Sequence, residues 1–504
     1  MTPPLLLMIL SLGLLGCGAP SAETGNGSDL LPGPPPTSGR AVAWEIHAPV
    51  SASLGTLFPI VVRGPEDISG TLPLQLNEKL IPVSIHRGVG SLVHAFDHSL
   101  LEISVDSPEG SIQVLANTLP VRTFAGVLTD EDLLWEESAS IHITETVTVP
   151  LGKILLVGPG TEILLEENVQ LEIIGDLTLA GEIDHPVVLT PALQAAWGSV
   201  HLHPGSTVSA SHTWWIRGGG DVSKAFGHSH SQPVIRVESA TFNAHGGGVL
   251  DSPGKAFGAS DSRVHLVDFL VSRCDTGGEF ERSQLIVETS HFVEIPDADG
   301  IAEDDDNDAL YLVDVLVEDG EPLETRITQS IFSQGEDDGI DQNGARVHVE
   351  RCWISGFAHE GVAASNGERI RIRDTWIEGC EQGIEAGYGS PEVIVEHCVV
   401  VNNEVGLRMG DDYDWEVDGT LTVTNSASVN NRVANVKNHV NALNGPAPDS
   451  IVIMCSMMDD PEWNEREGNV GGIPRWDSEG CLTEDSKGKN AGCDHLDIGK
   501  LTCP

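Results

Sequence analysis

The sequence predicts an all-β protein, most of which is a solenoid of short stacked strands. Gly accounts for 55 of the 504 residues and aromatic residues for only 5%, a balance that suits short strands with tight corners better than a large aromatic core. Apolar runs of four or five residues, each closed by Gly, Pro or a polar residue, follow one another from about residue 126. A segment of about 22 residues then repeats in the second half of the chain.

The N-terminal segment has the composition of an export signal followed by a tether. Residues 5–15 form an apolar stretch that is too short to span a bilayer. It ends in Leu-Leu-Gly-Cys at residues 14–17, which resembles the bacterial lipobox. The resemblance implies a lipoprotein signal peptide at residues 1–16 and lipidation of Cys17; the alternative is an ordinary signal peptide with a fortuitous Cys. Residues 17–40 are rich in Gly, Ser, Pro and Thr, which is typical of a flexible tether.

The residue after Cys17 and the net charge indicate location and partners. Gly18 follows Cys17, and by resemblance to Gram-negative lipoproteins this implies the outer membrane or the cell surface. The formal net charge of −49 repels nucleic acid and anionic lipid headgroups, which excludes both as partners. The predicted partners are therefore the outer membrane, through the lipid anchor, and a polysaccharide. The sequence does not indicate an oligomeric state.

Residues 41–125 differ in pattern from the rest of the chain. They alternate apolar and polar residues in short runs, and turn residues such as Gly64-Pro65 separate the runs. This pattern predicts a small antiparallel β-sandwich of the immunoglobulin-like type.

The internal repeat defines the central part of the chain. Residues 326–340, 347–362, 370–384 and 393–407 share one pattern, a short apolar strand followed by a Gly. These aligned glycines are spaced 22, 22 and 23 residues apart. A period near 22 with three short β-runs fits one coil of a parallel β-helix, whose strands pair with their equivalents in the next coil roughly 4.8 Å away. The aligned residues are Gly339, Gly361, Gly383 and Gly406.

Two motifs in the first predicted coils indicate the handedness of the β-helix through a family resemblance. The Val-Pro-Leu-Gly at residues 149–152 and the Gly-Pro-Gly-Thr at residues 158–161 resemble the first coils of right-handed, pectin-lyase-like β-helix proteins. The resemblance implies a right-handed parallel β-helix over residues 126–454. A leucine-rich-repeat solenoid is excluded because its Leu pattern and its asparagine ladder are missing.

The cysteines divide into two groups. Nine are present, and eight remain without Cys17, an even number for an oxidising compartment. Cys352 and Cys398 fall at equivalent positions two coils apart, too far for a disulfide, and are predicted to be buried free thiols. Residues 455–504 lose the repeat and are predicted to cap the open end of the helix. The disulfide candidates that would staple this cap are Cys455, Cys481, Cys493 and Cys503.

Acidic residues gather at one corner of the predicted coils. Asp338 and Glu360 directly precede aligned glycines, and Asp299 does the same if Gly300 is the equivalent glycine of an earlier coil. Carboxylates stacked about 5 Å apart repel one another unless protons, bases or a metal intervene. Calcium takes six to eight oxygen ligands and fits such a corner, although side chains that simply face solvent would give the same pattern. The predicted calcium ligands are Asp304, Asp306, Glu336, Asp338, Asp341 and Glu360.

The same corner resembles two families. Residues 335–341 and 359–362 resemble the β-helix module that accompanies CotH-type proteins, but the kinase-like domain is missing, so no kinase activity is implied. The pair Asp337-Asp338, with His359 one coil later, resembles polygalacturonase-type glycoside hydrolases. That resemblance implies hydrolysis by Asp337, Asp338, His359 and an earlier Asp299, with Arg371 binding the substrate.

The sequence also allows other kinds of site. A pectate-lyase-like activity requires calcium or an arginine to neutralise a uronate, together with a base. Arg371 and Arg408 are among the candidates for that arginine. His201 and His203 lie on one face of a strand and allow zinc, although polar alternation alone explains the spacing. Trp214 and Trp215 suggest a platform for sugar stacking or a packed corner.

The preferred hypothesis is a surface-anchored, non-catalytic β-helix lipoprotein that binds a glycan or another surface polymer. The alternatives are a polysaccharide-degrading enzyme, either a polygalacturonase-like hydrolase or a calcium-dependent lyase, and a structural or adhesive surface protein. Calcium is the one cofactor predicted. A convergent groove that contains Asp299, Asp337, Asp338 and His359 would favour the enzyme, whereas a flat acidic face would favour binding or structure.

Overall fold

A computed structural model describes residues 44–499 except 106–110, 118–120, 297–305, 412, 414, 440–449, 465 and 478–480. The predicted signal peptide, Cys17 and the tether lie outside the described residues. Within the described part of the chain, no helix is long and apolar enough to cross a membrane.

The first eight strands form the predicted β-sandwich. One sheet has the order β1-β3-β6 and the other the order β2-β8-β7-β4-β5. Both sheets contribute to one buried core, which includes Phe58, Leu74 and Ile103. The strands are β1 (Glu45–His47), β2 (Ser51–Ala52), β3 (Leu57–Arg63), β4 (Gly70–Leu76), β5 (Lys79–Ile85), β6 (Val89–Ala95), β7 (Leu100–Val105) and β8 (Ile112–Ala116).

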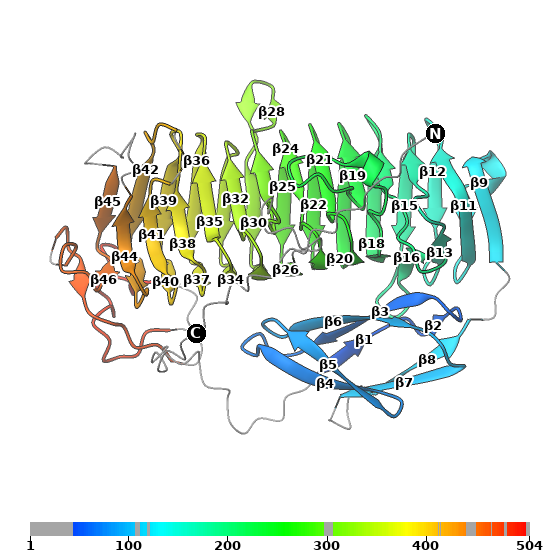
Figure 1. The fold of residues 1–504 in the computed structure, drawn as a ribbon, viewed down its shortest axis with the longest axis horizontal. Helices are drawn as coiled ribbons and strands as arrows, with labels where there is room; N and C mark the ends of the chain where they lie inside the picture. Colours follow the sequence, from blue (N-terminus) through cyan, green and yellow to red (C-terminus); the bar gives the residue numbers. More distant parts are fainter. Residues whose placement is uncertain are drawn as a thin grey trace, which may run out of the picture. The chain divides into compact units, whose positions relative to one another are not determined.

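The following strands form a parallel β-helix, which confirms the predicted fold class (Figure 1). Three ladders of parallel strands run along its length, and we call them ladders A, B and C. The ladders start beside β9 (Val121–Val127), which pairs with β11, just before the predicted boundary at residue 126. The antiparallel hairpin of β28 (Val317–Glu318) and β29 (Glu321–Pro322) projects from the stack (Figure 1). Two 3₁₀ turns are η1 (Asp130–Asp132) and η2 (Val222–Lys224).

The strands of each ladder recur once per coil. Ladder A contains β11 (Ser140–Val149), β14 (Leu171–Ile173), β17 (Val200–Leu202), β19 (Ile235–Glu238), β21 (Phe257–Ser260), β24 (Glu279–Glu281), β27 (Tyr311–Val313), β32 (Ile340–Asn343), β35 (Glu360–Ser365), β38 (Gln382–Ala386), β41 (Val405–Met409) and β44 (Ala434–Asn438). Ladder B contains β10 (Leu134–Trp135), β12 (Ile154–Val157), β15 (Asp176–Ala180), β18 (Thr207–Ile216), β20 (Thr241–Ser252), β22 (Arg263–Val267), β25 (Gln284–Glu288), β30 (Thr325–Thr328), β33 (Val347–Glu350), β36 (Arg369–Arg373), β39 (Glu392–Glu396), β42 (Thr420–Thr424) and β45 (Ile451–Met454). Ladder C contains β13 (Glu162–Leu165), β16 (Val187–Pro191), β23 (Leu270–Cys274), β26 (His291–Ile295), β31 (Ile331–Gly335), β34 (Trp353–Phe357), β37 (Trp376–Glu378), β40 (Val399–Val401), β43 (Ala427–Val429), β46 (Met457–Met458) and β47 (Val470–Gly471); the long strands β11, β18 and β20 also pair within it.

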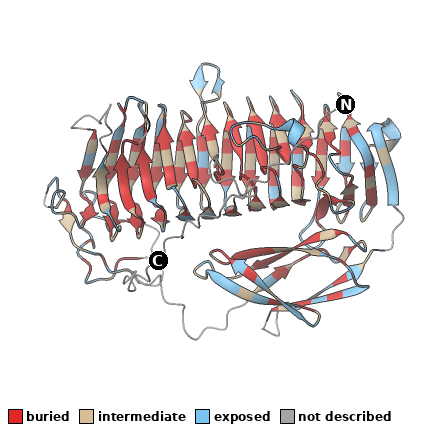
Figure 2. Ribbon diagram, viewed as in Figure 1, coloured by how far each residue is buried: buried red, intermediate tan, exposed pale blue. Residues whose placement is uncertain are grey.

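Alternating side chains fill the interior of the helix. In β36, Ile370 and Ile372 are buried while the arginines between and beside them face outward. The register stacks Val349 on Ile372 and Ile372 on Val395, so apolar residues of successive coils form continuous columns. Buried residues accordingly run along the whole stack (Figure 2).

A stack of small residues at one turn of successive coils contains the buried cysteines. Cys352, Thr375 and Cys398 occupy equivalent places in successive coils, and the backbone N–H of Cys352 donates to Thr375 Oγ1 at 3.3 Å. Each follows a residue in the left-handed region, such as Arg351 at φ 56°. Cys352 and Cys398 are free and buried, as predicted, and burial raises the pKa of both thiols to about 12. Their role is therefore packing rather than chemistry.

The C-terminal segment is stapled and lies along the side of the last coils. Cys455 and Cys493 form a disulfide with a Cα–Cα distance of 5.4 Å, and Cys481 is also disulfide-bonded. Cys503 lies outside the described residues. Ile498 packs with the outward-facing Val399 of ladder C. Trp463 of the same segment packs against the core of the helix, and Asn469 donates to the backbone oxygen of Ile453 on the last strand of ladder B at 3.1 Å.

The register makes a stability prediction that a matched pair of isoleucines can test. Ile372 is fully buried, whereas Ile394 in the next coil faces outward and is partly exposed. We expect Ile372→Ala to cost about 2–5 kcal/mol of unfolding free energy, since it leaves a cavity in the core. Ile394→Ala is expected to cost about 1 kcal/mol or less. Denaturant unfolding followed by circular dichroism measures both, and equal costs would contradict the assigned register.

Candidate functional site

The predicted acidic residues come together on ladder A. The parallel register places Tyr311, Asp341, Ala363, Glu385 and Arg408 opposite one another in successive strands. We call these five residues the outward column, because the residues that flank them in each strand are the ones that point into the core. Asp341 and Glu385 thus face the same side of the helix, two strands apart.

A second line of carboxyl groups runs along the corner that precedes these strands. Asp308, Asp338 and Glu360 follow one another in successive coils, and we call them the corner column. The N–H of Asp338 donates to Asp308 Oδ1 at 3.2 Å, and the N–H of Glu360 donates to Asp338 Oδ1 at 2.7 Å. Asp308 and Asp338 are only 3% and 6% exposed, so water screens them poorly.

Asp337 and His359 form an ion pair at this corner. His359 Nδ1 lies 2.6 Å from Asp337 Oδ1. This hydrogen bond outweighs partial burial and raises the pKa of His359 to about 9. The imidazole is therefore protonated at neutral pH and places one positive charge among the carboxyl groups.

Burial and like charge raise the pKa of several of these carboxyl groups. Burial and the nearby charges of Asp337 and Glu360 raise the pKa of Asp341 to about 8. Burial and like charges also raise the pKa of Asp308 and of Asp338 well above the usual range. Burial likewise raises the pKa of Glu385, and the guanidinium of Arg408 opposes that shift. Strongly shifted carboxyl groups that share one face are typical of acid–base sites.

Basic side chains flank the carboxyl groups at both ends. Arg408 donates to Gln382 Oε1 at 2.6 Å, and its guanidinium lies 3.2 Å from the carboxylate of Glu385. At the other end, His228 pairs with Asp306 at 2.8 Å. The backbone N–H of His228 donates to Glu279 Oε2 at 2.7 Å, so Glu279 on β24 holds the loop that carries this histidine.

An aromatic rim lies beside the outward column. Tyr413 and Trp415 are 62% and 64% exposed, and both rings lie within 6 Å of the ring of Tyr388. Asn343 donates to the hydroxyl oxygens of Tyr311 and Tyr388 at 3.0 and 3.2 Å, which ties the rim to the column. Exposed aromatic faces of this kind stack on the apolar faces of sugars. Trp214 and Trp215, the platform considered from the sequence, are instead buried.

The predicted catalytic residues are only partly brought together. Asp337, Asp338 and His359 converge, whereas Asp299 lies outside the described residues. Arg371 does not join them, because it lies on β36 of ladder B and pairs with Glu396 at 2.6 Å. Arg408 is the arginine of the outward column.

The predicted calcium ligands are also partly brought together. Asp306, Asp338, Asp341 and Glu360 influence one another electrostatically, and Glu336 directly precedes Asp337 at the same corner. Asp304 lies outside the described residues. Carboxylate oxygens suit a hard cation, and calcium at this corner stays a prediction.

Sequence reasoning missed Glu385 and the aromatic rim. Asp341, Ala363, Glu385 and Arg408 each stand two residues after an aligned Gly of the repeat. Extending the repeat register by two residues would therefore have found these four members of the column. The rim carries no such signal, because Tyr413 and Trp415 lie in a loop between β41 and β42 that interrupts the repeat.

Comparison with known proteins agrees with the fold. A family model described as a right handed beta helix region matches residues 315–439, which confirms the predicted handedness there. No curated protein matches the sequence. The crystal structure of the periplasmic alginate epimerase AlgG covers 65% of this chain and 79% of its own, with 11% identity and a TM-score of 0.37. The catalytic unit of a GH87 alpha-1,3-glucanase from Streptomyces thermodiastaticus covers 85% of this chain and 89% of its own, with 11% identity and a TM-score of 0.34. These likenesses concern the fold alone.

The raised pKa of Asp341 predicts the pH dependence of stability. The folded protein holds this proton up to about pH 8, whereas the unfolded chain releases it near its ordinary value, so unfolding free energy falls as pH rises between the two. A tenfold difference in proton affinity between the folded and unfolded states corresponds to about 1.4 kcal/mol of unfolding free energy. Even a fraction of the expected change in unfolding free energy is therefore measurable. Denaturant unfolding across this range should show a smaller fall for Asp341→Asn than for the wild type. Identical profiles would contradict a proton held at Asp341.

Proposed function

We propose that the β-helix binds a polysaccharide of neutral sugars and hydrolyses its glycosidic bonds at the outward column. The observation that carries this proposal is the placement of Asp341 and Glu385 two strands apart on one face, with only the methyl group of Ala363 between them. Two strand spacings are about 9.6 Å between backbones. Inverting glycosidases hold their two carboxyl groups about 6.5–9.5 Å apart to admit a water molecule. The small side chain at residue 363 leaves room for that water.

The two carboxyl groups differ in their surroundings, which assigns their roles. Asp341 lies among like charges, keeps its proton and acts as the general acid. Glu385 lies 3.2 Å from Arg408, whose charge opposes the rise that burial gives to the pKa of Glu385, so we assign the role of general base to Glu385. Asp341 gives its proton to the glycosidic oxygen as the C–O bond breaks. Water attacks the anomeric carbon and loses a proton to Glu385, which completes the hydrolysis.

The charges of the site support a neutral substrate. The chain carries a net charge of −49, and the guanidinium of Arg408 is already engaged by Gln382 and Glu385. A uronate at this column would add a further negative charge beside the carboxyl groups of Asp337 and Glu385, whose cationic partners are already engaged. The exposed rings of Tyr413 and Trp415 need no charge to hold a sugar.

Substitution of either carboxyl group tests the proposal. We expect Asp341→Asn and Glu385→Gln each to lower the rate of reducing-end formation on neutral polysaccharides by about 100-fold or more, since each removes one proton-transfer group. Glu396→Gln is the matched control, because Glu396 is paired with Arg371 on ladder B. Arg371→Ala should likewise retain activity.

A panel of neutral and uronate-containing polysaccharides, assayed with and without calcium, separates the alternatives. Unsaturated products would contradict hydrolysis and indicate a lyase. Binding without any product would contradict catalysis and restore the non-catalytic, glycan-binding protein that the sequence favoured. Absence of both binding and turnover would leave a structural or adhesive surface protein.

We further propose that the protein is anchored at the outer membrane or cell surface through a lipid on Cys17. The support is the lipobox-like Leu-Leu-Gly-Cys at residues 14–17 and the tether-like composition of residues 17–40. A labelled fatty acid supplied to expressing bacteria should be incorporated into the wild type and into Cys274→Ser, but not into Cys17→Ser. Equal labelling of Cys17→Ser would contradict the anchor.

A further inference from the structure

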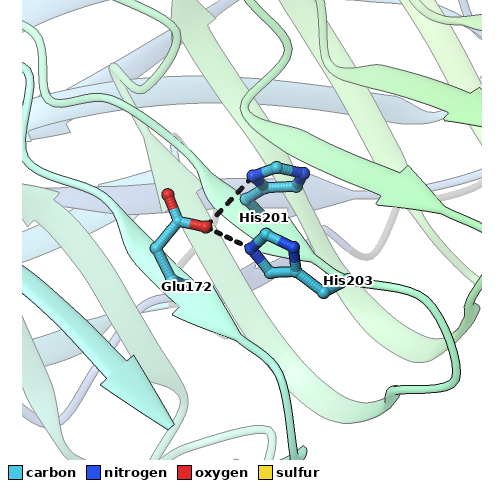
Figure 3. Close-up of side chains that lie close together, drawn as sticks. All are labelled: Glu172, His201 and His203. Atoms are coloured by element: carbon cyan, nitrogen blue, oxygen red, sulfur yellow. Dashed lines mark hydrogen bonds and ion pairs between the residues drawn. The ribbon is translucent and has the colours of Figure 1, made fainter. Parts of the chain in front are cut away.

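A second cluster of polar side chains lies on the first coils of ladder A, away from the proposed catalytic residues along the chain. The register places Glu172 of β14 opposite His201 of β17. His203 follows two residues later, so its side chain leaves the same face of the strand. Both rings point toward the carboxylate of Glu172 (Figure 3).

The donor atoms of this cluster have the spacing of a metal site. Glu172 Oε2 lies 3.1 Å from His201 Nδ1 and also contacts His203 Nε2. One ligand atom from each of the three residues lies within 4.8 Å of the other two. Ligands about 2.0–2.2 Å from a tetrahedral zinc ion are somewhat closer together than that, so small side-chain movements are sufficient. The side chains are 14–32% exposed, which leaves an ion a path from solvent.

A further carboxylate stands behind His201. The Nε2 atom of His201 is buried and makes no hydrogen bond, although Glu238 Oε2 lies only 3.2 Å away. Arg236 Nε donates to Glu238 Oε1 at 2.7 Å and fixes that carboxylate in place. Metal-bound histidines commonly donate their second N–H to such a carboxylate, which sets the tautomer and the ring orientation.

We propose that Glu172, His201 and His203 bind a divalent transition-metal ion, zinc in the first instance, with Glu238 as the residue that orients His201. Two imidazoles and one carboxylate select such an ion over calcium, which prefers oxygen ligands. Three protein ligands leave a coordination position open for water. The site is independent of the proposed hydrolysis.

Other histidine–carboxylate pairs on the outside of the helix lack this arrangement. His142 pairs with Glu166 at 2.8 Å and His265 with Glu288 at 2.9 Å, each with a single imidazole. These are ordinary ion pairs, and His265 therefore provides a matched control. The cluster of Asp337, Asp338 and His359 is the competing location for an ion, since its donor atoms also lie within 4.8 Å of one another.

Zinc titration of the full chain, with a chromophoric chelator as competitor, tests the site. The wild type is expected to bind one zinc ion that excess calcium does not displace, with the melting temperature raised. His201→Ala and His203→Ala should each weaken binding by about 100-fold or more. Glu238→Gln should weaken it by about 10- to 100-fold, as orienting residues do. His265→Ala should bind as the wild type does.

Cobalt distinguishes a specific site from surface association, because cobalt held by this ligand set gives a visible absorption that His201→Ala abolishes. The thermal melt of each metal-free variant shows whether it is folded. No zinc binding by the wild type would overturn the proposal. Zinc binding lost in His359→Ala and retained in His201→Ala would also overturn it, since the ion would then belong to the carboxyl cluster.

Discussion

Parallel pairing of each strand with its equivalent in the next coil is the constraint on which the rest of the structure depends. It stacks equivalent residues at a spacing of about 4.8 Å along the whole helix. Apolar residues therefore form columns such as Val349, Ile372 and Val395, and these columns make the core. The same pairing lines up the buried corner residues, where the N–H of Cys398 donates to Ser426 Oγ in the following coil.

The same constraint makes a carboxyl column costly unless its charge is removed. Asp308, Asp338 and Glu360 cannot move apart, because their backbones are held by the ladder and by hydrogen bonds to one another's carboxyl groups. Protons or cations must neutralise them. His359 supplies one positive charge, and burial together with the charges of Asp337 and Glu360 raises the pKa of Asp341 to about 8. The proposed general acid, Asp341, therefore owes its raised pKa to burial and to the neighbouring charges of the stack.

Sequence reasoning reached the site where the repeat is regular and failed where it is not. The aligned glycines located Asp338 and Glu360 correctly, and the same register contained Glu385 and Arg408 two residues further along. Arg371 was placed wrongly, because resemblance to a motif does not tell which of the three ladders a residue occupies. The β-sandwich and the β-helix could both be predicted from the sequence, because the alternation of apolar residues specifies which face of each strand is buried.

Where the coils differ in length, the sequence does not show which residues of neighbouring coils lie side by side. Glu172 and His201 are 29 residues apart, and His201 and Arg236 are 35 apart, whereas the later coils repeat at about 22. No fixed period connects Glu172 with the two histidines, so only the structure brings the three together. The loop that carries Tyr413 and Trp415 is hidden for the same reason, since it is inserted between two strands of the repeat.

The proposed hydrolysis requires a carboxyl group that keeps its proton at neutral pH, and infrared difference spectroscopy observes that proton directly. The part of the protonated-carboxyl carbonyl stretch that is lost as pH rises through about 8 should be present in the wild type at about pH 7 and missing from Asp341→Asn. A band already lost well below neutral pH, or one that Asp341→Asn leaves unchanged, would contradict the assignment of Asp341 as the acid.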